Sequence, residues 1–113
     1  MQIYHNPRCR KSREGLALLE ESGQKFEIVD YLNNPPDKKT LKEVLAKLGM
    51  APIELIRKNE TIWKEKFKGK TFSDDELIKI MIENPKLIER PIVINGDKAV
   101  LGRPPAKINE ILS

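Results

Sequence analysis

The spacing of apolar residues along this chain predicts a mixed α/β structure. Residues 2–4 and 26–31 are short apolar stretches with strand-favouring side chains. Between them, residues 9–22 place leucines on one helical face, and Gly23 suits the left-handed residue that ends a helix. A strand, a helix and a strand within about thirty residues form a βαβ unit, so we expect the first two strands to be parallel.

The middle of the chain reads as mostly helical. Leu41, Val44, Leu45 and Leu48 recur at i, i+3, i+4 and i+7, which is the clearest amphipathic helix in the sequence. A short helix from Pro52 and a capped helix after Ser73 are also predicted, whereas residues 58–70 are polar and weakly patterned, with at most a short helix. We therefore expect a mostly helical insertion at about residues 35–85.

The C-terminal part returns to strands. Residues 92–94 and 99–101 are apolar and flank Asn95-Gly96-Asp97, and Asn-Gly between apolar runs predicts a β-hairpin. A last helix should start at Pro104-Pro105. The layout suits one domain over residues 1–113 with a thioredoxin-like (glutaredoxin-type) α/β fold, in which a mixed four-stranded sheet carries the helical insertion.

Composition and charge argue against several classes of function. The 113 residues carry a net charge of +4 that is mostly dispersed, and aromatic residues are only 5%, so we expect no nucleic-acid partner. No apolar run reaches the roughly 18 residues of a membrane span, and the charged N-terminus does not resemble a signal peptide. One cysteine and one histidine predict neither a disulfide nor a metal site. A cytoplasmic protein, expected to be monomeric and metal-free, fits these features.

The exception to the dispersed charge is the segment around Cys9. This cysteine follows a predicted strand and opens a predicted helix, where unpaired N–H groups and the helix dipole favour an anion such as a thiolate. Arg8 and Arg10 add positive charge nearby. Ser12 stands where a C-x-x-C motif has its second cysteine, and His5 offers a further cation or donor, so both are candidates to support the thiolate. Without a second cysteine, a redox cycle needs an external thiol.

Several further motifs occur in order along the chain. They are Tyr4 to Arg13, Tyr31-Leu32 with Pro35-Pro36, Leu55 to Asn59, Glu89 to Val93, and Gly102-Arg103-Pro104. Together they resemble the glutaredoxin-coupled arsenate reductases, and most closely an arsenate-reductase-like branch of that family. The resemblance covers nearly the whole chain and implies the same thioredoxin-like fold.

The resemblance also implies roles for single residues. Cys9 would attack arsenate, and Arg57, Arg90 and Arg103 would hold the oxyanion. Pro91 would follow a cis peptide bond and direct Arg90 across the site. Glutathione would be a co-substrate, glutaredoxin a protein partner, and no cofactor would be bound.

Two other functions stay open at this point. Cys9-x-x-Ser12 also suits a monothiol, glutathione-dependent thiol transferase. A transcription regulator similar to the Spx proteins, which share this fold and bind RNA polymerase, is the third hypothesis. Ser12 removes the two-cysteine switch that many of those regulators use.

Overall fold

The structure is a computed structural model that describes residues 1–112. The chain forms two compact units. The first unit contains Met1–Asn34 and the chain from Arg90 onward, and the second unit contains Pro35–Glu89. No helix in the described part is long and apolar enough to cross a membrane.

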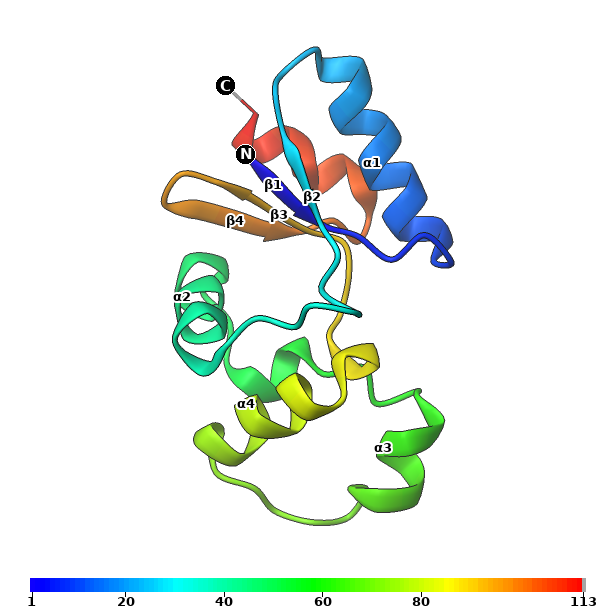
Figure 1. Ribbon diagram of the computed structural model, residues 1–113, viewed down its shortest axis with the longest axis vertical. Coiled ribbons are helices and arrows are strands. Elements are labelled where there is room, and N and C mark those ends of the chain that lie inside the picture. The colour runs from blue at the N-terminus through cyan, green and yellow to red at the C-terminus, as the bar shows by residue number, and fades with distance from the viewer. Residues whose placement is uncertain (113) are drawn as a thin grey trace. The chain divides into compact units, whose positions relative to one another are not determined.

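The first unit is built on a mixed four-stranded sheet in the order β2-β1-β3-β4 (Figure 1). β1 pairs with β2 in parallel, as the βαβ pattern predicted, and the other neighbours are antiparallel. Asn95 pairs with Lys98, so Gly96 takes the first position of a two-residue turn, with a positive φ of 64°. The strands are β1 (Gln2–Tyr4), β2 (Glu27–Val29), β3 (Ile92–Asn95) and β4 (Lys98–Leu101).

One face of this sheet is covered by α1 (Arg10–Ser22) and by the 3-10 helix η3 (Pro105–Ile111). Their apolar side chains join those of β1 and β3 in one core. Gly23 ends α1 with φ 72°, as expected. The core residues are Ile3, Leu19, Val93, Ile108 and Ile111.

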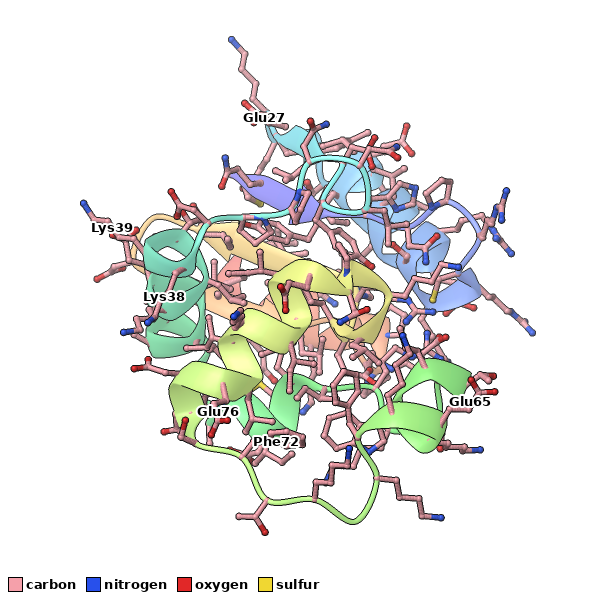
Figure 2. All side chains as sticks on the ribbon, turned by 60° about the horizontal axis from the view of Figure 1, so that its bottom comes forward. Glu27, Lys38, Lys39, Glu65, Phe72 and Glu76 are labelled. Carbon is pink, nitrogen blue, oxygen red and sulfur yellow. The ribbon has the colours of Figure 1, made fainter. Side chains whose placement is uncertain are left out.

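The second unit is helical, which confirms the predicted insertion. Its elements are α2 (Lys38–Leu48), η1 (Pro52–Leu55), α3 (Thr61–Lys66), α4 (Asp74–Glu83) and η2 (Pro85–Leu87). Asp37 caps α2 by accepting a hydrogen bond from the Thr40 N–H at 2.8 Å. Ser73 and Glu76 form the predicted capping box at the start of α4. Figure 2 shows Lys38 and Lys39 on α2 and Glu76 on α4.

A cluster of three aromatic rings organises residues 60–72, for which the sequence predicts no role. Trp63 and Phe67 lie one helical turn apart, with ring centroids 5.6 Å apart. Phe72 packs against both, at 6.3 Å from Trp63 and 5.9 Å from Phe67. The three rings fasten the segment that follows α3 and give it a structural role within the second unit.

The thioredoxin-like fold class is confirmed, with two local differences. β2 spans Glu27–Val29 rather than residues 26–31, because the Asp30 carboxylate accepts hydrogen bonds from the main chain and side chain of Asn33 and turns the chain. The last helix is a 3-10 helix, not an α-helix. A single domain over residues 1–113 stays a prediction.

Candidate active site

Cys9 is the N-cap residue of α1, the position expected for it. Its backbone is extended (φ −96°, ψ 122°), and its N–H donates to the Asn6 carbonyl at 3.0 Å. The thiol makes no capping hydrogen bond and is half-buried. Because the first-turn N–H groups of a helix favour a negative charge, this placement suits a thiolate.

Ser12 is fully buried, and its hydroxyl connects the two ends of the Cys9 loop. The Asn6 N–H donates to Ser12 Oγ at 2.9 Å, and Nδ1 of His5 lies 2.8 Å from the same oxygen. If Nδ1 carries a proton it donates to Oγ, which leaves the Ser12 proton for another acceptor. If Nδ1 is unprotonated, Ser12 donates to it. The His5 tautomer therefore decides where the Ser12 proton points.

The charge of His5 follows from its surroundings. Burial lowers the pKa of His5 below its ordinary value of 6.5. The hydrogen bond with Ser12 opposes this shift, and the positive charge of Arg13 adds to it. His5 is thus neutral near pH 7, and it contributes to the loop as a hydrogen-bonding group rather than as a cation.

Asn6 organises the loop through both its main chain and its side chain. Besides its main-chain bonds to Ser12 and Cys9, its side-chain Oδ1 accepts the Arg8 N–H at 3.0 Å. Asparagine before proline is a turn signal that could have pointed to this role.

The cations of this segment lie mostly in water. Arg8 is exposed, and the Arg10 side chain is 84% exposed and donates through Nε to Glu14 at 3.1 Å. Lys11 approaches the same carboxylate at 4.0 Å. Arg13 instead folds back and donates to the Pro7 carbonyl at 2.9 Å. Since water screens exposed charges, thiolate support by Arg8 and Arg10 stays a prediction, and Arg10 has a carboxylate partner on its own helix.

Arg90 and Arg103 are neighbours in the first unit. Nη1 of Arg103 donates to the Arg90 carbonyl at 3.2 Å. Arg90 is buried, and its Nε has no hydrogen-bond partner among residues 1–112. The Arg90–Pro91 bond is cis, as expected for Pro91, and the Arg103–Pro104 bond is cis as well. A buried guanidinium with an unused donor is suited to an anion.

Two glycines allow close packing of the backbone beside these arginines. A Cβ on Gly15 of α1 would lie 2.9 Å from Cγ of Pro91 and 3.1 Å from Cδ1 of Ile108. A Cβ on Gly102 would meet the same two atoms at the same distances. Only glycine therefore allows α1 and the segment before Arg103 to pack this closely on Pro91.

Arg57 lies in the second unit, just after η1. Its N–H donates to the Leu87 carbonyl at 2.7 Å, beside an isolated antiparallel bridge between Ile56 and Ile88. Its guanidinium lies between two carboxylates, with Nη1 3.6 Å from Glu60 and Nε 3.7 Å from Glu89. The i, i+3 spacing could have indicated Glu60, but Glu89 is too distant in sequence to be inferred.

These placements can be compared with known proteins. Residues 4–111 match the ArsC family. The chain belongs to the ArsC family. The match includes Cys9 and all three arginines, so both units of this ArsC-family chain are covered.

Individual relatives align over almost their full length. An arsenate reductase from Haemophilus influenzae is 45% identical over 112 residues, covering 97% of each chain. The uncharacterized protein YfgD from Escherichia coli (strain K12) is 48% identical over 114 residues, covering 99% of this chain and 96% of that protein. The solved structure of an arsenate reductase from Vibrio cholerae has a TM-score of 0.92 at 45% identity, covering 99% of this chain and 98% of the other.

The ArsC-family chain offers little to a metal ion. Within residues 1–112, no three side chains of the types His, Cys, Asp and Glu gather in a group that could hold one. The first unit contains a cysteine at a helix N-terminus, a buried His5–Ser12 pair, and two arginines joined by a hydrogen bond. This set is suited to thiol chemistry on an anion.

Proposed function

We propose that this ArsC-family protein is an oxidoreductase that reduces arsenate to arsenite through Cys9. The observation that carries the proposal is the position of Cys9, at the N-terminus of α1, in a chain of this family. A thiolate at a helix N-terminus is an active nucleophile, and the half-buried thiol is open to a small substrate.

Arg57, Arg90 and Arg103 are proposed to bind the oxyanion. Arsenate is negatively charged near neutral pH, and so is the attacking thiolate, so their approach needs positive charge. Guanidinium groups stay charged and form paired hydrogen bonds to oxyanions. Within residues 1–112, Nε of Arg90 and Nη1 of Arg57 are buried without a hydrogen-bond partner, which supports these assignments. His5, Ser12, Arg8 and Arg10 are proposed to support the thiolate.

The proposed reaction balances with two thiols for each arsenate. Cys9 sulfur forms a bond to arsenic(V) and a protonated oxygen leaves as water. The glutathione thiol then forms a second sulfur–arsenic bond and displaces another oxygen as water. The glutaredoxin thiolate attacks the glutathione sulfur, which breaks that sulfur–arsenic bond and leaves its electron pair on arsenic. Arsenic(V) becomes arsenic(III), and the two donor thiols end as one disulfide. Release of arsenite from sulfur by water regenerates Cys9.

The proposed chemistry also implies the reductants, the protein partner and the location. Because Cys9 has no second cysteine in the chain, its reductants come from outside, with glutathione as co-substrate and glutaredoxin as partner. We propose a cytoplasmic monomer without a bound cofactor, where a glutathione pool keeps thiols reduced.

A coupled assay tests the proposal. NADPH oxidation is followed with glutathione, glutathione reductase and a glutaredoxin, with and without arsenate. We expect arsenate-dependent oxidation that Cys9→Ser abolishes and Arg57→Ala strongly reduces. Lys58→Ala, which removes the exposed cation next in the chain, is the control and should retain activity.

Other outcomes of this assay would overturn the proposal. Turnover of a glutathione mixed disulfide without arsenate turnover, insensitive to Arg57→Ala and Arg103→Ala, would identify a monothiol transferase. Absence of both activities, with retention of RNA polymerase on a column of the protein, would identify an Spx-like regulator.

A further inference from the structure

The positive charge of the first unit is concentrated in the sequence around Cys9. Residues 8–14 contain four cations and one acid, which gives this segment a net charge of +3. The other charged side chains of the unit are five cations, with Arg90 and Arg103 among them, and six acids, so they sum to −1. We call the four cations of the segment the Cys9 basic patch. They are Arg8, Arg10, Lys11 and Arg13.

All four cations of the Cys9 basic patch are exposed to solvent. Glu14 is the one acid of the segment, and two cations share it: Arg10 Nε donates to it at 3.1 Å, and Lys11 Nζ lies 4.0 Å from its other oxygen. One carboxylate cannot neutralise two cations. Within residues 1–112, the Arg8 side chain makes no ion pair. The patch therefore keeps positive charge available to a partner from solution.

The Cys9 basic patch opposes the dipole of α1. The first turn of a helix carries partial positive charge and favours acids, and the last turn favours cations. α1 has no acid in its first turn and no basic residue in its last turn, where Glu20 and Glu21 lie. α4, by contrast, has three acids in its first turn. Cations at the start of α1 make this helix less stable, so helix stability does not explain them.

The spread of the patch suits a protein surface better than a small anion. Its charges extend from the loop between β1 and α1 into the first turn of α1 (Figure 1). Water and salt screen each exposed cation, so a small anion is held only weakly. A protein surface with several carboxylates meets several of these cations at once and excludes water from them, which strengthens each contact. Three of the four cations are arginines, which are enriched in protein interfaces.

We propose that the Cys9 basic patch is the docking surface for the acidic face of a protein thiol reductant. Cys9 lies within the patch, is half-buried and is the one cysteine of the chain, so an adduct or disulfide on it is reduced by an external thiol. Attraction between the patch and carboxylates beside the partner's thiol speeds their association. This inference rests on the proposed function in one respect, that Cys9 is the reacting group.

Reduction of a mixed disulfide on Cys9 tests the docking without arsenate. Glutathione disulfide first reacts with the Cys9 thiolate, which leaves one glutathione on Cys9 and releases the other. The thiolate of a glutaredoxin with net negative charge then attacks the glutathione sulfur, so that glutathione moves to the glutaredoxin and Cys9 leaves as a thiolate. Mass spectrometry of quenched samples gives the rate. The same reduction by dithiothreitol, a small thiol without carboxylates, measures the intrinsic reactivity of the disulfide.

Charge reversal at Arg8 and Lys11 removes the proposed attraction. Arg10 and Arg13 are left in place, because their hydrogen bonds to Glu14 and to a main-chain carbonyl hold the segment. We expect Arg8→Glu and Lys11→Glu each to lower the ratio of the glutaredoxin rate to the dithiothreitol rate, and the double variant to lower it by on the order of tenfold or more. The ratio separates docking from any change in the reactivity of Cys9.

Salt and matched charge reversals are the controls. Raising the ionic strength from about 20 mM to about 200 mM should lower the ratio for the wild-type protein, whereas the double variant should not show this decrease. Lys25→Glu and Lys98→Glu make the same charge changes at exposed sites of the first unit outside the patch, singly or together. They should retain the wild-type ratio. Thermal unfolding verifies that each variant is folded, and Lys11→Glu, which places an acid in the first turn of α1, should be at least as stable as the wild-type protein.

The proposal is overturned if the patch variants keep the wild-type ratio, if the control variants lower it equally, or if salt leaves the wild-type ratio unchanged. A glutaredoxin that does not reduce the mixed disulfide at all overturns it as well. These results are separable from the proposed function. A patch-dependent ratio in a protein that does not reduce arsenate would refute only the arsenate reductase activity. Arsenate turnover with a ratio that is independent of the patch would refute only the docking surface.

Discussion

Nη1 of Arg103 donates a hydrogen bond to the main-chain carbonyl of Arg90 at 3.2 Å. Two of the three arginines assigned to the oxyanion are thus linked directly, and the link runs through the backbone of a residue that precedes a cis proline. The Arg103 guanidinium is planar and carries its donors in a fixed geometry. Arg103 thus contacts the main chain of Arg90, and in the proposed function it would also bind the anion.

Two substitutions of Arg103 should separate the effect of its positive charge on activity from the effect of its planar guanidinium group. Arg103→Lys keeps the positive charge but loses the planar fork, so we expect kcat/KM for arsenate to fall by about 10- to 100-fold, equivalent to one charged hydrogen bond. Arg103→Ala should lose more. Lys107→Ala, at an exposed site of η3, is the matched control. Full activity of Arg103→Lys would show that the fork has no role.

Ser12→Ala should destabilise the loop that carries Cys9. The change leaves the Asn6 N–H and the His5 Nδ1 without their shared oxygen in a buried place. We expect the free energy of unfolding to fall by about 1–3 kcal/mol, the usual cost of unsatisfied buried polar groups. Urea unfolding measures the change, with Thr71→Ala at an exposed site as control. Equal stability of the two variants would contradict the buried network.

The low pKa of His5 predicts a loss of stability in mild acid. Since burial lowers the pKa in the folded state below 6.5, the unfolded chain binds a proton first as the pH falls. The contribution of His5 to folding stability is therefore fully present above pH 6.5, and it is lost as the pH falls below that value. His5→Asn keeps a polar group but cannot titrate, so its unfolding free energy should vary less over this range.

Three acidic side chains have pKa values that are shifted away from the pH range of that measurement. The pKa values of Asp37, Asp75 and Glu76 are lowered, chiefly by hydrogen bonds from Thr40, Lys42 and Ser73 respectively. Their protonation is thereby moved further from pH 6.5, where the loss of stability due to His5 begins. Identical pH dependence in the wild-type protein and His5→Asn would refute the assignment.

Gly15 and Gly102 make the same close approach to Pro91, but their substitution should differ in effect. Each new Cβ overpacks the junction, at a cost of about 1–3 kcal/mol. At Gly15, inside α1, alanine gains about 1 kcal/mol of helix propensity, which offsets part of that cost. We expect Gly102→Ala to be the more destabilising in thermal unfolding.

A reverse substitution isolates the propensity effect. Ala17→Gly, at an exposed site of the same helix, measures propensity without packing. If Gly15→Ala stabilises the protein by as much as Ala17→Gly destabilises it, the contact with Pro91 has no energetic weight.

The features that sequence reasoning predicted well are those set by neighbouring residues. The βαβ unit, the left-handed Gly23, the Ser73–Glu76 capping box and the Asn-Gly hairpin each depend on a few consecutive positions. Local conformational preference and hydrophobic periodicity are enough to specify them. Cys9 at the start of α1 belongs to the same class.

The features that were missed depend on contacts between distant positions. Glu89 approaches Arg57 although more than thirty residues separate them in sequence. Gly15 lies against Pro91 although the two are also far apart in sequence. The sheet register and helix packing that bring them together cannot be read from local patterns. By contrast, the ion pair between Arg10 and Glu14 is local, because four residues separate them on α1.

Detection of arsenic on Cys9 tests the central claim most directly. The protein is incubated with arsenate and glutathione without glutaredoxin, and the peptide containing Cys9 is analysed by mass spectrometry. We predict an arsenic-bearing adduct on Cys9 that is absent from Cys9→Ser. A Cys9 peptide that carries glutathione but never arsenic would contradict the account.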